Sequence, residues 1–178
     1  ALSENSIYFV NASDQRIYQQ QFGTTTPVAI TESGPRFADL IIDSVNHRLI
    51  AVCEQHDETT EPENYLVGIS LAAGNMQITP LARGADFYAY PRISPAGKSL
   101  CWIEWNHPNM PWDSTQLWQA DIHNHCLENK RLIAGGDGLE AIFQPQWSPD
   151  NRLYYVSDRN NWWNIYSADH GVIVDMPA

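Results

Sequence analysis

Short apolar runs separated by polar turns recur along the whole chain, and their spacing predicts β-strands. Four segments share one plan, a turn followed by an apolar strand: ENSIYFVNASD from Glu4, DSVNHRLIAVCE from Asp43, SPAGKSLCWIEW from Ser94 and SPDNRLYYVSD from Ser148. No stretch of useful length carries the helical spacing of apolar residues. The chain is therefore expected to be all-β and built from repeats.

Each repeat contains the signals of up to four strands. The first is visible as AYPRI and FQPQW, and the second is the shared apolar run. The third appears as RIYQQ, YLVGIS, QLWQADI and NIYSAD, and the fourth as PVAIT, MQITPL, KRLIA and GVIVD. The residues Ile7, Leu49, Leu100 and Leu153 align at intervals close to the roughly 40 to 50 residues of a propeller blade, and we expect them at equivalent buried positions. The predicted fold is a β-propeller of four-stranded antiparallel blades, about four in number, at approximately 1–34, 35–84, 85–138 and 139–178.

The turns between the first and second strands have a readable chemistry. Ser94–Gly97 and Ser148–Asn151 place proline at the second turn position and then a residue that tolerates positive φ. Such turns join antiparallel strands, which supports the hairpin order within each blade.

The first repeat opens at its second strand, so its first strand is expected to lie before Ala1. Either residues 171–175 (GVIVD) supply that strand and close a four-bladed ring, or the chain is part of a larger propeller. The incomplete blade and the absence of an initiator methionine favour the larger propeller. Exposed strand edges recruit further strands, so self-association through the terminal blades is expected.

Composition and net charge restrict the kinds of partner that the chain can bind. The 178 residues are 43% hydrophobic and 11% aromatic, as in a globular domain, and no apolar run approaches the roughly 18 residues that cross a bilayer. The net charge of −11 repels phosphate backbones and anionic lipids, which argues against nucleic acid and membrane partners. Peptides with a free amine remain compatible with it.

Three cysteines lack the spacing of a disulfide framework or a metal site. Cys53 and Cys101 lie in apolar runs and are read as buried, reduced thiols, which indicates a cytoplasmic protein. His123, His125 and Cys126 lie where a hairpin is expected; they can be read as three zinc ligands or as a solvated turn, and the turn is favoured because a fourth ligand is missing. No cofactor is expected, since no phosphate-cradling pattern is present.

The residues also carry a family resemblance. The Ser-Pro turns before short apolar strands resemble TolB-like propeller repeats. FYAYPRISPAGKSLCWIEWNHPNMPWDSTQLWQADI, residues 87–122, and IFQPQWSPDNRLYYVSDRNNWWNIY resemble the propeller of prolyl oligopeptidase-family serine peptidases of the acylaminoacyl-peptidase and dipeptidyl-aminopeptidase type. The resemblance extends from about Phe37 to Tyr166 and departs from the usual turn residues at Ala96 and Asn151.

This resemblance implies a propeller stacked on an α/β-hydrolase domain, where it docks that domain and gates the access of peptides to a Ser-Asp-His triad. The chain itself contains no Gly-x-Ser-x-Gly nucleophile elbow, so it is expected to hydrolyse nothing alone. The alternative is a stand-alone TolB-like propeller that binds a protein or ligand through its loops.

The stretch WIEWNHPNMPWD, residues 102–113, is the strongest candidate for a functional surface. It is predicted to end the second strand of the third repeat and to form the loop to the third strand, as CEQHDETTEPENY does in the second repeat. Prolines lower the cost of ordering a loop and tryptophans supply contact area. The residues proposed to shape a peptide passage or contact the second domain are Glu104, Trp105, His107, Trp112 and Asp113. Packing between blades is the competing interpretation, and it is preferred for Trp102, while either acid could instead cap its own loop.

Overall fold

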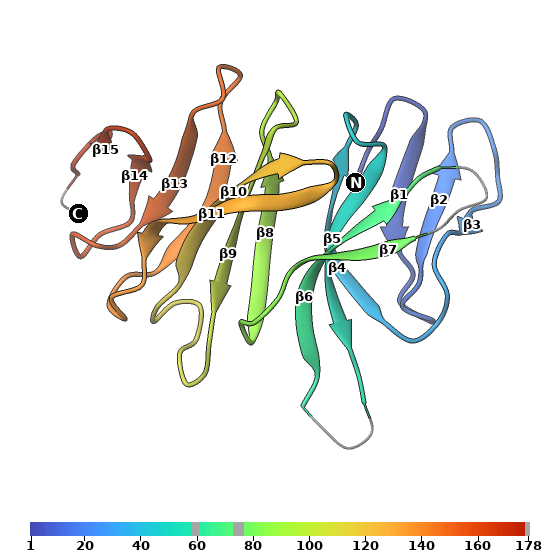
Figure 1. The fold of residues 1–178 in the computed structure, drawn as a ribbon, viewed down its shortest axis with the longest axis horizontal. Coiled ribbons are helices and arrows are strands. Elements are labelled where there is room, and N and C mark those ends of the chain that lie inside the picture. The colour runs from blue at the N-terminus through green and yellow to red at the C-terminus, as the bar shows by residue number, and fades with distance from the viewer. Residues whose placement is uncertain (58–60, 73–76, 177–178) are drawn as a thin grey trace. The chain divides into compact units, whose positions relative to one another are not determined.

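The computed structural model describes residues 1–57, 61–72 and 77–176, and its regular secondary structure is entirely β (Figure 1). The all-β prediction is therefore confirmed. Within these residues there is no helix of the length and apolarity that a membrane span needs. The chain divides into two compact units, Ala1–Gly84 and Ala85–Ala178.

Unit 1, Ala1–Gly84, contains two antiparallel sheets in which each strand pairs with the next along the chain. The first sheet has the order β1 (Ser6–Val10), β2 (Ile17–Gln21) and β3 (Val28–Ala29). The second has the order β4 (Arg36–Asp43), β5 (Arg48–Gln55), β6 (Glu63–Ser70) and β7 (Ile78–Ala82).

Unit 2, Ala85–Ala178, repeats this plan with two four-stranded antiparallel sheets. One consists of β8 (Phe87–Ile93), β9 (Ser99–Trp105), β10 (Gln116–His123) and β11 (Cys126–Gly135). The other consists of β12 (Ile142–Trp147), β13 (Leu153–Ser157), β14 (Asn164–Ser167) and β15 (Gly171–Val172). Sequential pairing of short strands is the arrangement of propeller blades.

The tight turns between first and second strands follow the predicted chemistry. The backbone N–H of Gly97 donates to the carbonyl of Ser94 at 2.8 Å, and that of Asn151 donates to Ser148 at 3.0 Å. Gly97 and Asn151 have positive φ angles of 67° and 63°. Proline at the second position and a left-handed residue at the fourth thus close both turns, as the sequence predicts.

The four aligned apolar positions all lie in second strands, but their burial differs. Leu49 and Leu100 are fully buried and Leu153 is 2% exposed, whereas Ile7 is 40% exposed. The prediction of burial is wrong for Ile7, because the hydrophobic cluster of unit 1 packs against the opposite face of β1, through Tyr8. Alternate residues of a strand point to opposite faces, so Ile7 points away from that cluster.

The first residues of the chain run alongside the free edge of β1. The Ala1 ammonium donates to the Tyr8 carbonyl at 2.7 Å, the Tyr8 N–H donates back to Ala1 at 2.8 Å, and Leu2 forms a bridge to Ile7. Leu2 thus lies where the other sheets place their first strand, but it forms one isolated bridge and no strand. The first sheet therefore has three strands where the others have four, as expected for a repeat that opens at its second strand. Residues 171–172 of the GVIVD segment pair instead with β14 and extend the fourth sheet.

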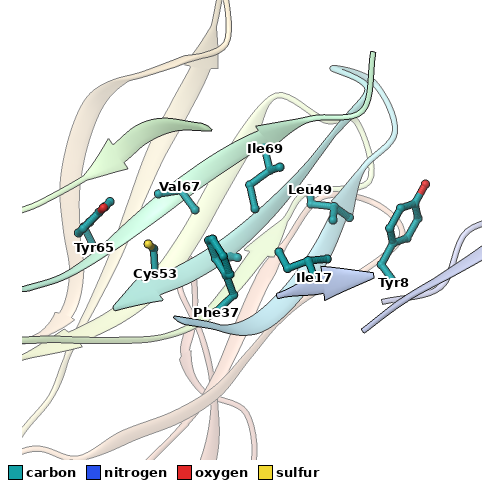
Figure 2. Close-up of a cluster of buried hydrophobic side chains, with 9 residues drawn as sticks. Tyr8, Ile17, Phe37, Leu49, Cys53, Tyr65, Val67 and Ile69 are labelled. Atoms are coloured by element: carbon teal, nitrogen blue, oxygen red, sulfur yellow. The ribbon is translucent and has the colours of Figure 1, made fainter. Parts of the chain in front are cut away.

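Each unit has a hydrophobic core between its two sheets. In unit 1, Tyr8 and Ile17 of the first sheet meet a row of side chains from the second, shown together in Figure 2: Phe37, Leu49, Ala51, Cys53, Tyr65, Val67 and Ile69. In unit 2 the corresponding cluster comprises Cys101, Ile103, Leu117, Ala134, Ile142, Leu153, Tyr155 and Tyr166. A fully buried side chain of the size of leucine stabilises the fold by about 1.5–3 kcal/mol, so the sheets are held in pairs face to face.

The first strand of each four-stranded sheet is interrupted by a β-bulge. The register shifts between Ala38 and Ile41 in β4, between Ala89 and Arg92 in β8, and between Phe143 and Gln146 in β12. Within the bulges Asp39, Tyr90 and Gln144 have φ angles of 51°, 52° and 50°. Positive φ is uncommon for residues other than glycine, so the residue types at these positions do not predict the bulges.

Candidate functional site

The predicted loop between the second and third strands of the third sheet is confirmed as residues 106–115, between β9 and β10. It is fixed by bonds to its own backbone. The Asp86 carboxylate accepts from the His107 N–H at 2.9 Å, and the Asp113 carboxylate accepts from the Met110 N–H at 3.0 Å. Asp113 therefore caps its own loop with one oxygen while its side chain stays on the exposed surface.

The aromatic side chains of this loop fall into two groups, one held by ring contacts and one exposed to solvent. The Phe87 ring stacks on Trp105 with centroids 5.2 Å apart and meets the edge of His107 at 4.9 Å. Trp105 is half-buried, whereas Trp112 is 60% exposed and Met110 is 44% exposed. Trp105 and His107 thus hold the base of the loop, and Trp112 offers its ring to the solvent.

Glu104 is buried and already has partners. Its carboxylate accepts from the Trp102 indole N–H at 2.7 Å and from the Lys130 ammonium at 3.0 and 3.2 Å. Lys130 also lies 4.1 Å from the centre of the Trp118 ring. The charge of Glu104 is therefore compensated within the sheet, and Trp102 is fully buried, as its packing interpretation requires.

A second aromatic loop of unit 2 was not predicted as part of the site. Residues 158–163 join β13 to β14, the same connection that 106–115 makes in the preceding sheet, and in Figure 1 both loops lie at the end of the unit opposite the β8–β9 and β12–β13 turns. Trp162 and Trp163 are 46% and 51% exposed, and Trp163 meets the edge of Phe143 at 5.4 Å. The adjacent tryptophans at this point of the repeat are the signal that could have identified it.

A buried carboxylate positions this second loop. Glu140 accepts from the Ser157 hydroxyl at 2.5 Å, from the Arg159 guanidinium at 2.8 Å and from the Gly135 N–H at 3.0 Å. The carboxylate of Asp158, which follows Ser157 in the sequence, accepts from the Ala141 N–H at 2.8 Å. Charge-assisted bonds of this kind are stronger than neutral ones, so the start of the loop is tied to the segment after β11.

The corresponding loop of unit 1 is described only in part, because residues 58–60 lie outside the described range. Just before this loop, Cys53 of β5 takes the place that Glu104 has in β9, because Cys53 pairs with Phe37 as Glu104 pairs with Tyr88. His56 forms a hydrogen bond with Glu54 in this loop.

The predicted hairpin at His123–Cys126 is confirmed. His123 and Cys126 pair across it, and Asn124 and His125 have φ angles of 47° and 67°, the pair of left-handed residues that a two-residue hairpin turn requires. His123 lies 3.6 Å from the Glu128 carboxylate. Among the described residues there is no group of three or more potential ligands with metal-site geometry.

The predicted burial of two cysteines is confirmed. Cys53 and Cys101 are 1% and 0% exposed, Cys126 is exposed, and all three are free thiols. Burial raises the pKa of the Cys101 thiol to about 12, against the opposing effect of the nearby Arg92 charge. A neutral thiol of this kind acts as a small apolar side chain.

Comparisons with known proteins define the class of this fold. Neither the family models nor the curated proteins contain a match. Among solved structures, the β-propeller domain of the Trilobed protease from Pyrococcus furiosus matches 81% of the chain, and the chain covers 43% of it, with 19% identity and a TM-score of 0.54. This likeness shows the fold, a β-propeller.

Two puromycin-hydrolysing proteins are more similar. A puromycin-hydrolysing peptidase of Mycobacterium tuberculosis matches 100% of the chain at 33% identity with a TM-score of 0.83, and a puromycin hydrolase variant complexed with PGG matches 95% at 25% identity with a TM-score of 0.84. The chain spans 29% of the length of each. The matched parts are N-terminal propeller domains of prolyl oligopeptidase-family peptidases, so the resemblance predicted from the sequence is confirmed.

Proposed function

We propose that this chain is the non-catalytic propeller portion of a prolyl oligopeptidase-family serine peptidase, where it docks the α/β-hydrolase domain and gates the access of peptides to its active site. The observation that carries the proposal is the match of the whole chain to a puromycin-hydrolysing peptidase at 33% identity. Catalysis would come from the hydrolase domain, because the sequence holds no nucleophile elbow.

The β9–β10 loop is the proposed lining of the peptide passage. Phe87 fixes Trp105 and His107, and the loop then presents Trp112 and the acidic Asp113 on the surface. An aromatic wall excludes water, and an acidic edge attracts a cation. Glu104 supports the base of this loop through its bonds to β9 and β11.

The substrate class follows from charge. A chain with a net charge of −11 attracts the ammonium group of a free peptide amino terminus. This favours substrates of the dipeptidyl-aminopeptidase type over acylated peptides. Amides of the puromycin type belong to the proposal because two structures similar to this chain are those of puromycin-hydrolysing proteins. Free cysteines are compatible with the proposed cytoplasmic location.

Self-association through blade edges and faces is a further part of the proposal. Apolar side chains are exposed on the first sheet at Ile7, Phe9 and Val28, and on the fourth at Ile165 and Val172. Contiguous exposed apolar surface marks contact sites. A second copy of the chain, or further blades, would cover it.

The test is steady-state kinetics on the full-length protein that contains this chain, with Trp112→Ala and Asp113→Asn. We expect kcat/KM for aminoacyl and peptide amides to fall by about three- to tenfold for Trp112→Ala, the range expected when one exposed aromatic contact is lost. Asp113→Asn should lower kcat/KM more at low ionic strength than at high, because an exposed charge is screened by salt.

The matched control is Asp150→Asn, which removes an exposed acid from the β12–β13 turn at the other end of the sheets. It should leave kcat/KM unchanged. Thermal unfolding of each variant separates a passage role from packing: unchanged kinetics per folded molecule in both loop variants would refute the passage, and inactivity of the full-length wild-type protein toward all such amides would refute the peptidase assignment.

A further inference from the structure

A pocket of about 490 Å³ opens in unit 2 between the first strands of its two sheets. Its polar lining comes from Tyr90 and Arg92 of β8 and from Gln144 and Gln146 of β12. Tyr154 and Ile165, from β13 and β14, line it as well. None of its lining residues belongs to the loop proposed for the peptide passage.

The two bulges explain why these side chains converge. Tyr90 and Gln144 occupy the left-handed positions of the bulges in β8 and β12, and the register of each strand shifts there. A bulge breaks the regular alternation of side chains and re-aims them, and Tyr90 and Arg92 of β8 both line the pocket, as do Gln144 and Gln146 of β12. The same bulge in β4 shows that it belongs to the first strands generally, whereas the residues displayed here are particular to unit 2.

Arg92 is the chemically distinctive residue of the pocket. Its guanidinium is half-buried, donates at 2.7 Å to the Pro91 carbonyl and lies 5.5 Å from the centre of the Tyr90 ring. The Trp147 indole N–H donates to the Arg92 carbonyl at 3.0 Å and fixes the backbone below it.

The guanidinium has no carboxylate partner among the described residues, and no acid lines the pocket. Most other cations of this acidic chain do form ion pairs, namely Arg36, Arg48, Arg83, Lys130, Arg131, Arg152 and Arg159. A partly desolvated guanidinium with unused donors is a site for an anion.

We propose that this pocket binds the carboxylate of a small organic acid or peptide. Arg92 donates from its planar guanidinium to both carboxylate oxygens, the carboxamides of Gln144 and Gln146 donate to the remaining oxygen lone pairs, and Tyr154 and Ile165 contact the apolar body of the ligand. This proposal uses none of the residues assigned to the peptide passage, so it does not depend on the proposed peptidase function.

A carboxylate suits the pocket better than a phosphate. The fork of one arginine matches two coplanar carboxylate oxygens, and the pocket contains no second cation for a doubly charged group. The net charge of −11 also opposes a dianion more strongly than a monoanion.

The experiment titrates the ¹⁵N-labelled chain with N-acetyl-leucine, with its uncharged match N-acetyl-leucinamide and with inorganic phosphate. The readouts are the dissociation constant from calorimetry and the Arg92 Nε–Hε resonance. We expect the acid to bind at least roughly tenfold more tightly than the amide, the effect of one charge-assisted bidentate pair, and only the acid to shift that resonance.

Arg92→Gln should abolish the preference for the acid, Arg92→Lys should retain part of it, and Lys98→Gln, which removes a cation from the β8–β9 turn, should leave it intact. If Arg92→Gln fails to fold, Arg92→Lys and the wild-type resonance decide the matter. Equal binding of acid and amide, an unshifted Arg92 resonance, or tighter binding of phosphate than of the acid would each overturn the proposal.

Discussion

The substitution Gly135→Ala tests how closely β10 and β11 approach at the end of their hairpin. A Cβ atom on Gly135 would lie 2.0 Å from the Thr115 carbonyl oxygen, far inside van der Waals contact, and Gly135 has a φ of 79°. Gly138 provides a matched control, since its φ is 80° and a Cβ there would meet nothing within 4 Å. The two substitutions therefore share the backbone strain and differ only in the clash.

The expected loss of unfolding free energy follows from the backbone strain and the clash. Alanine in the left-handed region costs about 1–2 kcal/mol at either position. At Gly135 the clash also forces β11 away from β10, which disturbs the Gln116 pairing and the bond from the Gly135 N–H to Glu140 at 3.0 Å. Two disturbed hydrogen bonds at about 1 kcal/mol each bring the expected loss for Gly135→Ala to about 3–4 kcal/mol, roughly 2 more than for Gly138→Ala.

Urea unfolding followed by tryptophan fluorescence measures both variants against the wild type. The slope of unfolding free energy against urea should be unchanged, so the difference appears in the midpoint. Equal destabilisation by the two substitutions would show that the chain relieves the clash without cost, and that the close approach at Gly135 does not contribute to stability.

Two further predictions concern ionisable groups. Native chain treated with a maleimide at pH 8 should be labelled at one thiol, the exposed Cys126, because burial keeps Cys101 neutral with its pKa at about 12. In urea the labelling should extend to all three thiols. Labelling of the native chain that survives Cys126→Ser would contradict this prediction. Burial likewise raises the pKa of Tyr65 to about 12 from an ordinary value of 10.0, with the Cys53 hydrogen bond adding to the effect, so the folded phenol stays neutral while the unfolded one ionises. The free energy of unfolding should therefore fall as pH rises from about 10 toward 12, and Tyr65→Phe should make this fall shallower in urea titrations; an identical pH dependence in the two proteins would refute the assignment.

Most strands and tight turns can be predicted from the sequence alone. Polar turn residues bound each strand, and proline followed by a positive-φ residue closes Ser94–Gly97 and Ser148–Asn151 because these residue types prefer those backbone angles in any context. The alignment of Leu49, Leu100 and Leu153 is correct for the same reason, since repeated local patterns produce repeated strands. The position of the 106–115 loop follows directly from that alignment.

The candidate site was only partly predictable. Sequence showed an aromatic, proline-containing loop, and Trp112 does lie exposed at its surface. It could not show that Lys130, far along the chain, neutralises Glu104 in the adjacent part of the sheet. The partner of a charged side chain depends on strand register, and register is set by pairing between segments.

Tertiary structure alone decided which faces of the strands are covered and which side chains converge. Ile7 reads as a core residue, yet the cluster packs on the other face of β1. The bulges at Tyr90 and Gln144 arise in residues with no intrinsic preference for positive φ, so the surrounding sheet imposes them. The Arg92 pocket exists for the same reason: its lining comes from strands of two different sheets, and only their packing brings the guanidinium and the two carboxamides together.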